Sequence, residues 1–178
     1  MPRAFVGTDV WCMSAKTDIA VLEEQVRKSV QLLAKLDRFY RTFIETDLPR
    51  WGRTQAAAIV LADVFGRFYT CGETLFLRVS QLFENQLSRE RWHADLLEKM
   101  TLRVPGVREA AIGDDTYALL AEFLKFRHFN RYYFEGDYDW EKIEYLQRKY
   151  EQVKPLLARD LARFQQFLEQ LRESAADD

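Results

Sequence analysis

Apolar side chains recur every three or four positions along most of this chain, which is the spacing of one face of an α-helix. In the first such stretch, Glu, Lys, Arg and Gln fill the positions between the apolar residues. Its apolar members are Ile19, Leu22, Val26, Val30, Leu33, Leu36, Phe39, Tyr40, Phe43 and Ile44. Thr17 and Asp18 suit the amino end of a helix, and Leu48 followed by Pro49 predicts its end, because proline pushes the preceding residue out of the α region. We therefore predict one long amphipathic helix over residues 17–48.

The most apolar stretch of the chain spans residues 51–87 and keeps the same helical spacing. Gly66 and Gly72 lie inside it, and each costs roughly 1 kcal/mol relative to alanine in a helix. We interpret both glycines as permitting close helix packing or a bend. A second long helix is therefore predicted to continue through them.

The middle of the chain predicts a short helix, a loop and a third long helix. Ser88 suits the start of the short helix over residues 89–102, and Pro105-Gly106 follows its end. The third long helix is predicted from Thr116, after two aspartates that suit a helix amino end. Gly136 is expected to break it.

The last helical pattern follows Asp139, a suitable cap, and contains Pro155, which is expected to kink the helix. Four long helices with short connections and one minor helix predict an all-α fold, an antiparallel four-helix up-down bundle with one additional short helix. We expect a flexible N-terminal arm in residues 1–16, the helical bundle in residues 17–173 and a frayed tail in residues 174–178.

The composition agrees with one helical domain, since 48% of the 178 residues are apolar and only seven are glycine and four proline. The formal net charge of −2 argues against nucleic-acid binding through overall charge, so any basic surface must be local. Cys12 and Cys71 are too few for a metal framework and predict reduced thiols. We find no signal-peptide pattern and no apolar run long enough to cross a bilayer, and we expect a cytoplasmic location without cofactor or metal.

The run over residues 126–134 concentrates the side chains that suit chemistry. On a helix, its polar arc of about 140° holds Arg127, His128, Arg131 and Tyr132, and its opposite side holds Phe126, Phe129 and Tyr133. Two guanidinium groups four residues apart can bind a phosphodiester, and a histidine one turn away can exchange a proton near neutral pH. The same pattern also suits a solvated helix face with a structural histidine, and the residue types alone leave both interpretations open.

Two residues elsewhere are candidates for supporting roles. Glu73 lies in the most apolar helix, where a buried carboxylate needs a cationic partner. It either pairs with Arg127 or Arg131 in the site or lies at an edge in solvent. His93 follows Trp92 at a helix start, where a partly exposed structural histidine is the simpler interpretation.

Three segments of the chain resemble one family. The order Phe-Arg-His, two residues, Arg, and an acidic turn leading to Asp-Trp-Glu resembles the C-terminal signature of HepT-like proteins, the toxin halves of HepT/MNT toxin–antitoxin pairs. Residues 68–73 resemble the family's tyrosine-to-glutamate stretch and supply Tyr69 and Glu73 as supporting residues. Residues 92–100 resemble its tryptophan–histidine segment. The resemblance spans residues 17–171 in order, and the combination is more specific than any one piece.

This resemblance implies an all-helical homodimer with ribonuclease activity that pairs with a small MNT-type nucleotidyltransferase, its antitoxin. Members of the family were earlier described as nucleotidyltransferase substrate-binding subunits. The family's active motif is an arginine, four to six residues, a histidine, any residue and a tyrosine. The resemblance also implies that the antitoxin neutralises the toxin by attaching AMP to a tyrosine of this motif.

This chain departs from the motif at both chemical positions. It supplies Arg127 but places Tyr132 where the histidine belongs and Phe134 where the tyrosine belongs. A phenol with a pKa of about 10 is a poor general base at neutral pH, and phenylalanine has no hydroxyl. Three outcomes remain open. His128 replaces the missing base; or Tyr132 or Tyr133 acts as the acid or as the AMP acceptor, with Tyr132 the better placed; or the protein is a catalytically inactive subunit that docks a nucleotidyltransferase.

Overall fold

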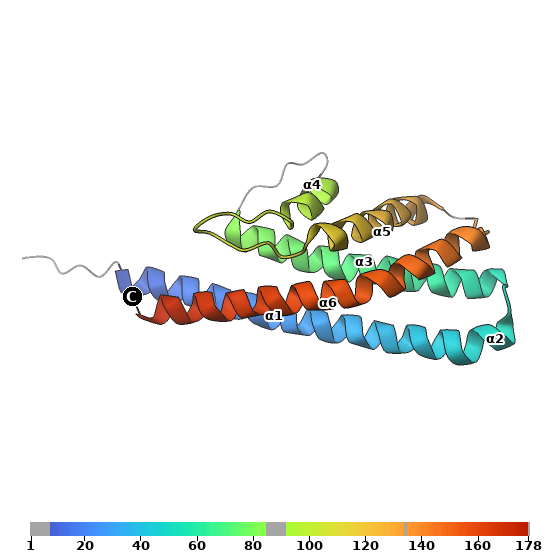
Figure 1. Cartoon of the computed structure of the whole chain (residues 1–178), viewed down its shortest axis with the longest axis horizontal. Coiled ribbons are helices and arrows are strands. Elements are labelled where there is room, and N and C mark those ends of the chain that lie inside the picture. Colours follow the sequence, from blue (N-terminus) through green and yellow to red (C-terminus); the bar gives the residue numbers. More distant parts are fainter. Residues whose placement is uncertain (1–7, 85–91, 134, 178) are drawn as a thin grey trace, which may run out of the picture.

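The computed structural model describes residues 8–84, 92–133 and 135–177. These residues form helices and connections, with a single isolated bridge between Val104 and Arg108 and no longer strand among them. In chain order the elements are α1 (Thr8–Thr42), the π-helical turn η1 (Phe43–Asp47), α2 (Leu48–Trp51), α3 (Gln55–Phe83), α4 (Trp92–Lys99), α5 (Asp114–Tyr132) and α6 (Trp140–Asp177) (Figure 1). The predicted all-α fold is confirmed.

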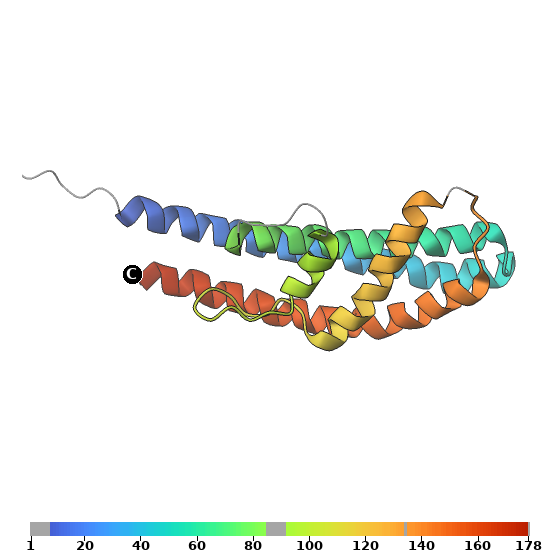
Figure 2. The same cartoon turned by 90° about the horizontal axis from the view of Figure 1, so that it is seen from above.

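Three long helices, α1, α3 and α6, lie side by side along the molecule, and each contacts the other two. The fourth, α5, packs on α3 and α6 on the side away from α1 and crosses them obliquely (Figure 2). The short α4 packs on α3 and α5. The finer prediction of four antiparallel rods is not confirmed, because α5 is steeply inclined to the other three.

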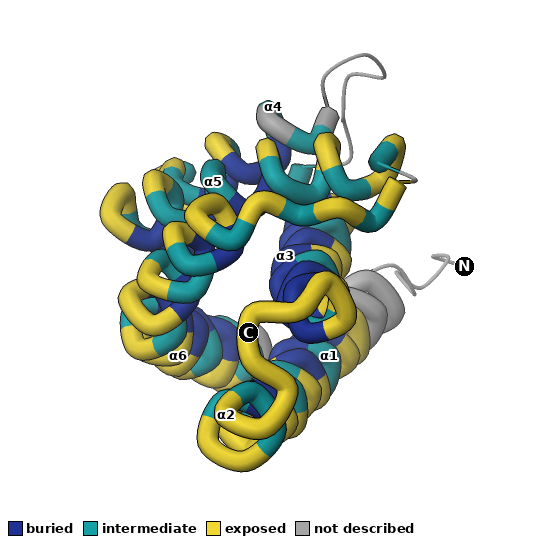
Figure 3. The backbone as a smooth tube through the Cα atoms, turned by 90° about the vertical axis from the view of Figure 1, so that its right-hand side faces the viewer, coloured by how far each residue is buried: buried dark blue, intermediate teal, exposed yellow. Residues whose placement is uncertain are grey.

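Aromatic rings fill the centre, toward which the buried sides of the helices turn (Figure 3). Tyr150 of α6 lies 4.6 Å from Tyr40 of α1 and 5.0 Å from Phe68 of α3, measured between ring centroids. Phe123 of α5 lies 5.4 Å from Phe68. Each such pair contributes about 0.5–1.5 kcal/mol beyond the burial of its area. Four helices therefore share one aromatic core, and this core fixes the position of α5.

The ends of the first helix differ from the prediction. The predicted start at Thr17 is wrong, because α1 begins at Thr8. Pro49 does not end the helical path either: η1 widens the helix by one residue per turn, and Pro49 then occupies the first turn of α2, where its missing N–H is harmless. The chain turns only at Gly52, whose φ of 65° suits glycine.

The starts of α3 and α4 also shift. Thr54, which the sequence pattern did not single out, caps α3 by accepting a hydrogen bond of 3.3 Å from the Ala57 N–H. Consequently α3 begins at Gln55 rather than at Trp51, and it continues through its glycines as predicted. The predicted cap Ser88 lies outside the described residues, and α4 is described from Trp92.

A buried arginine holds the connection between α4 and α5. Arg108 donates from Nε to Glu84 at 2.9 Å, from Nη1 to the Leu102 carbonyl at 2.8 Å and from Nη2 to the Lys99 carbonyl at 2.7 Å. Glu84 directly follows α3. The connection is therefore tied to the end of α3, which keeps α4 beside α3 and α5.

A buried carboxylate of α6 caps α5. Asp160 accepts a hydrogen bond of 2.8 Å from the Gly113 N–H and one of 2.6 Å from the Thr116 hydroxyl. Burial alone would raise the pKa of Asp160, but these two hydrogen bonds and the nearby arginines hold it below its ordinary value. The amino end of α5 is thereby anchored to α6, which the sequence pattern within α5 could not indicate.

The connection from α5 to α6 ends α5 earlier than predicted. Helix α5 stops at Tyr132, before Gly136, whose φ of 70° requires a residue without a side chain. Asp139 caps α6 as predicted, accepting a hydrogen bond of 2.9 Å from the Glu141 N–H. Helix α6 passes through Pro155 unbroken and curves along its length (Figure 1). None of the described helices is long and apolar enough to cross a membrane.

Candidate functional site

Glu73, on the buried side of α3, links a histidine and an arginine from two other helices. Only 6% of its side chain is exposed. Its Oε1 lies 2.6 Å from Nδ1 of His93 on α4, and its Oε2 lies 3.1 Å from Nη2 of Arg127 on α5. Of the positions left open for Glu73, the structure shows the pairing with Arg127. A carboxylate so deeply buried is stable only with such partners, so Glu73 fixes both side chains in place.

The two histidines of the chain meet at this point. The rings of His93 and His128 lie 5.5 Å apart and nearly perpendicular, at 84°. Glu73 engages Nδ1 of His93, so a buried carboxylate orients this imidazole. His93 exposes 18% of its side chain, whereas His128 lies at the surface. We call Glu73, His93, Arg127 and His128 the Glu73 cluster.

Tyr69 lies one turn before Glu73 on α3 and completes the buried side of the cluster. The guanidinium of Arg127 lies 6.0 Å from the centre of its ring. Burial, and then the charge of Glu73, raise the pKa of Tyr69 above its ordinary value, while Arg127 opposes the shift. The hydroxyl of Tyr69 therefore keeps its proton at neutral pH and acts as a hydrogen-bonding group rather than as a base.

A cavity of about 580 Å³ between α1, α3 and α5 opens beside the cluster. Its arginines are Arg67 and Arg78 of α3 and Arg127 and Arg131 of α5. Arg67 is paired with Asp63 at 2.6 Å, so the lining carries both signs with an excess of positive charge. Because Arg127 belongs to both, this arginine cavity leads directly to the Glu73 cluster. Several guanidinium groups around one cavity suit the phosphates of a nucleic acid.

The tyrosines of the central run have different surroundings. Tyr132, the last residue of α5, is 69% exposed, and the Arg131 guanidinium lies 5.8 Å from its ring centre. Tyr133 follows the helix and donates a hydrogen bond of 2.7 Å to the Asp137 carbonyl. Phe134 lies outside the described residues. Of the two tyrosines, Tyr132 is the more accessible to a modifying enzyme.

Comparison with known proteins adds the family. A family model described as HepT-like protein matches residues 60–168, more than half of the chain. The chain belongs to the HepT-like family. No curated protein and no solved structure matches it. The matched segment of this HepT-like chain contains the whole Glu73 cluster.

The predicted site residues of the HepT-like chain divide into two groups. Tyr69, Glu73 and Arg127 meet around the buried carboxylate, and His128 joins them through its ring contact with His93. Arg131 lines the arginine cavity, Tyr132 is exposed, and Tyr133 is half-buried against Phe129. His93, which the sequence favoured as structural, joins the first group. Its place in the tryptophan–histidine segment was the available signal, since that segment resembles the family independently of the central run.

The cluster can bind a phosphate and move protons. Arg127 offers guanidinium donors, and two imidazoles lie beside it, one of them oriented by a carboxylate. This is the arrangement of a base held by an orienting group. Among the residues that the structure describes, no group of His, Cys, Asp and Glu has the arrangement of a metal site. The groups that are present suit anion binding and proton transfer.

Proposed function

We propose that this HepT-like protein is the toxin-side member of a two-component toxin–antitoxin module and that it cleaves RNA at the Glu73 cluster. Membership of the HepT-like family supports the module. The observation that carries the ribonuclease activity is the meeting of His93 and His128 beside Arg127, with Glu73 holding His93 at 2.6 Å. A homodimer and a small nucleotidyltransferase antitoxin, acting in the cytoplasm, belong to the same proposal.

The reaction follows from the groups present. The 2′-oxygen of a ribose bonds to the adjacent phosphorus, and the bond from phosphorus to the 5′-oxygen breaks. One imidazole accepts the proton of the 2′-hydroxyl, and the other, protonated, donates a proton to the departing 5′-oxygen. Arg127 stabilises the added negative charge on the phosphoryl oxygens. The products are a 2′,3′-cyclic phosphate and a 5′-hydroxyl, and no redox partner is needed.

The substituted motif does not prevent this reaction. Tyr132 and Phe134 stand at the positions of the family's histidine and tyrosine, but the Glu73 cluster draws on neither. Imidazole groups serve acid–base chemistry near neutral pH better than a phenol does. In this chain we therefore assign proton transfer to His93 and His128 and phosphate binding to Arg127 and Arg131.

Replacing Arg127 tests the ribonuclease directly. Purified protein is expected to cleave single-stranded RNA, also in the presence of EDTA, and Arg127→Ala is expected to lower the rate by about 10²–10³-fold. Arg127→Lys, which keeps a positive charge beside Glu73, separates the loss of charge from the loss of the guanidinium geometry. Arg53→Ala, which removes a surface arginine paired with Glu144, is the matched control and should cleave like wild type. Intact RNA with the wild-type protein, or equal rates for Arg127→Ala, would refute the activity.

A second candidate function is a binding subunit that presents Tyr132 to a nucleotidyltransferase. The exposure of this side chain favours it, because 69% of Tyr132 is accessible. After incubation with ATP and the nucleotidyltransferase encoded beside it, we expect a mass gain of one AMP on Tyr132. Tyr132→Phe should lose the adduct, whereas Tyr133→Phe, which removes the hydroxyl bound to Asp137, should retain it. An adduct that persists in Tyr132→Phe would exclude Tyr132 as the acceptor.

A further inference from the structure

A second cavity, on the other side of α5 from Arg127, has walls made of aromatic rings. It measures about 410 Å³ and lies between α5, the connection to α6 and the first turns of α6. The rings that line it are Phe126, Phe129, Tyr133, Tyr138 and Tyr145. Its volume is within the range of small-ligand sites in proteins, about 300–1,000 Å³.

The rings form a platform that is ordered before any ligand binds. Phe129 and Tyr133 are stacked, with centroids 4.6 Å apart and an interplanar angle of 27°, and Tyr138 lies 5.4 Å from Tyr133. Gln55 of α3 fixes the backbone of Tyr138 through hydrogen bonds of 2.8 Å and 3.2 Å. Tyr133 is held in turn by its bond to the Asp137 carbonyl. These contacts hold the rings of the platform in place, and Phe129 leaves 46% of its surface exposed.

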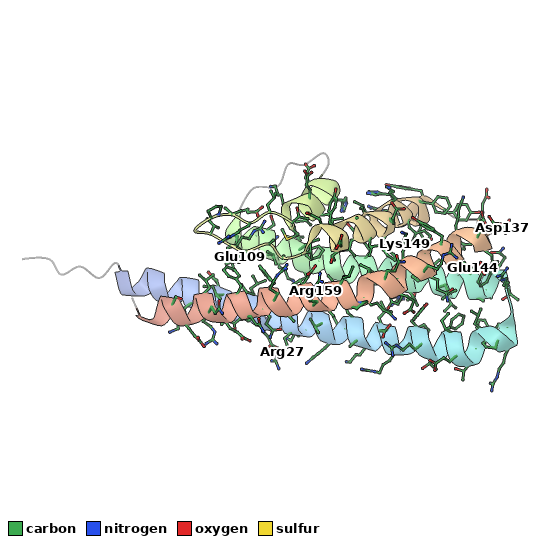
Figure 4. The ribbon with its side chains drawn as sticks, viewed as in Figure 1. Arg27, Glu109, Asp137, Glu144, Lys149 and Arg159 are labelled. Atoms are coloured by element: carbon green, nitrogen blue, oxygen red, sulfur yellow. The ribbon has the colours of Figure 1, made fainter. Side chains whose placement is uncertain are left out.

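Polar groups at the rim match a nucleobase rather than an aliphatic ligand. Asp137 and Asp139 line the cavity from the connection before α6, at the end of the molecule where Figure 4 labels Asp137. Lys142 lines it from α6, and Lys125 lines it from α5, where it is paired with Glu122, another lining residue, at 2.7 Å. Carboxylates accept hydrogen bonds from the amino and imino groups of bases, and the ammonium group of Lys142 suits a neighbouring phosphate. Aromatic rings with such a rim are typical of sites that hold unpaired bases.

The cavity lies within one nucleotide's reach of the Glu73 cluster. At about 100° per residue, His128, Tyr132 and Phe129 follow one another around α5, and the whole arc from His128 to Phe129 covers about 100°. On a helix about 10–12 Å across, that arc is roughly 10 Å long. A strand whose phosphate lies at His128 can therefore cross Tyr132 and bring the next base to Phe129.

We propose that this aromatic cavity binds one nucleobase of single-stranded RNA beside the phosphate that is cleaved. The proposal rests on the proposed ribonuclease function and adds the form of its substrate. An unpaired base enters the cavity and stacks on Phe129, while the backbone runs over α5 toward Arg127 and the arginine cavity. Duplex RNA, whose bases are stacked on each other, does not fit this arrangement.

Binding of uncleavable RNA tests the base site separately from catalysis. The probe is a fluorescently labelled 2′-O-methyl trinucleotide, compared with three versions that each lack one base, and the measurement is fluorescence anisotropy. Phe129→Ala is expected to weaken binding of the intact probe at least about fivefold. Phe129→Ala should not change the affinity for the version of the probe that lacks the base held by the cavity. Phe129→Tyr, which keeps the ring, should bind like wild type.

The matched control is Phe39→Ala, which deletes the same side chain from an exposed position on α1, where 54% of Phe39 is accessible. It should leave all four affinities unchanged, and circular dichroism should show that both alanine variants are folded. Equal losses of affinity for the intact and the base-lacking probes, or no loss in Phe129→Ala, would overturn the base site. The base site would also be overturned if Phe129→Ala changed the affinity for AMP but not the affinity for the trinucleotide. Because the probe cannot be cleaved, absence of ribonuclease activity leaves this result interpretable.

Discussion

His93→Asn is expected to lower the rate of RNA cleavage by about 10²–10⁴-fold, the range for loss of a general acid or base. His93 is the imidazole that Glu73 orients, at 2.6 Å from its Nδ1. Asparagine can still donate a hydrogen bond to Glu73, so the buried carboxylate keeps a partner, but it cannot exchange a proton at neutral pH. The loss should appear in kcat rather than in KM, because His93 acts on the transition state and the arginines bind the substrate.

Companion variants separate catalysis from folding. His128→Asn should lower the cleavage rate by a similar factor. The double variant should lower the rate by much less than the product of the two single factors, because both histidines serve one reaction. Glu98→Ala, an exposed substitution on the same helix as His93, is the control and should cleave like wild type. A His93→Asn protein that is folded and cleaves RNA within about twofold of the wild-type rate would assign His93 a structural role.

Asp160→Ala is expected to lower the free energy of unfolding by about 3 kcal/mol at pH 7, the scale for removing one partner of a buried, charge-assisted network. The substitution leaves the Gly113 N–H and the Thr116 hydroxyl without the carboxylate that binds them at 2.8 Å and 2.6 Å. Asp160 is fully buried, so water cannot replace it without rearrangement. Urea denaturation measures the change.

The contribution of Asp160 should also depend on pH. Its pKa in the folded protein is lower than the ordinary value of 3.8, so the unfolded chain binds the proton more tightly. The stabilisation is complete well above pH 3.8 and is lost as the pH falls through the lower, folded pKa. Asp160→Asn should remove this part of the acid dependence. Asp63→Ala, at an exposed pair, should change stability by less than about 1 kcal/mol, and an equal loss there would contradict the role of burial.

Local signals in the sequence predicted the elements of the fold better than their boundaries. Asp139 caps α6 as expected, because capping needs only neighbouring residues. The start of α1 at Thr8 was missed. The path through Pro49 was also missed, because a π-helical turn ends just before this proline, which then lies in the first turn of α2. The anchoring of α5 depends on Asp160, a residue remote in the sequence, and no pattern within α5 indicates it.

For the site, as for the fold, the sequence indicated the candidate residues better than the contacts between remote helices. Glu73, a carboxylate within the most apolar helix, was a candidate for pairing with Arg127 or Arg131, and it pairs with Arg127. The role of His93 was not predictable from spacing, because its contact with Glu73 depends on how α4 packs on α3. The helical arc correctly separated the polar Tyr132 from the aromatic Tyr133, but it could not show that α5 ends between them.

In the proposed function, the Glu73 cluster supplies proton transfer and phosphate binding without the two substituted motif positions. The four residues come from three helices, α3, α4 and α5, and the packing of these helices fixes their geometry. Tyr132 lies at the edge of this group, in solvent. The motif position that Tyr132 occupies is therefore exposed, whereas the charge pair of Glu73 and Arg127 is largely buried.

The most direct measurement identifies the ends of RNA after incubation with wild-type protein and with the His93→Asn/His128→Asn double variant. Wild-type protein is expected to produce 2′,3′-cyclic phosphate and 5′-hydroxyl ends, and the folded double variant none above background. RNA left intact by the wild-type protein, or the same ends produced by the double variant, would contradict a catalytic role for the Glu73 cluster.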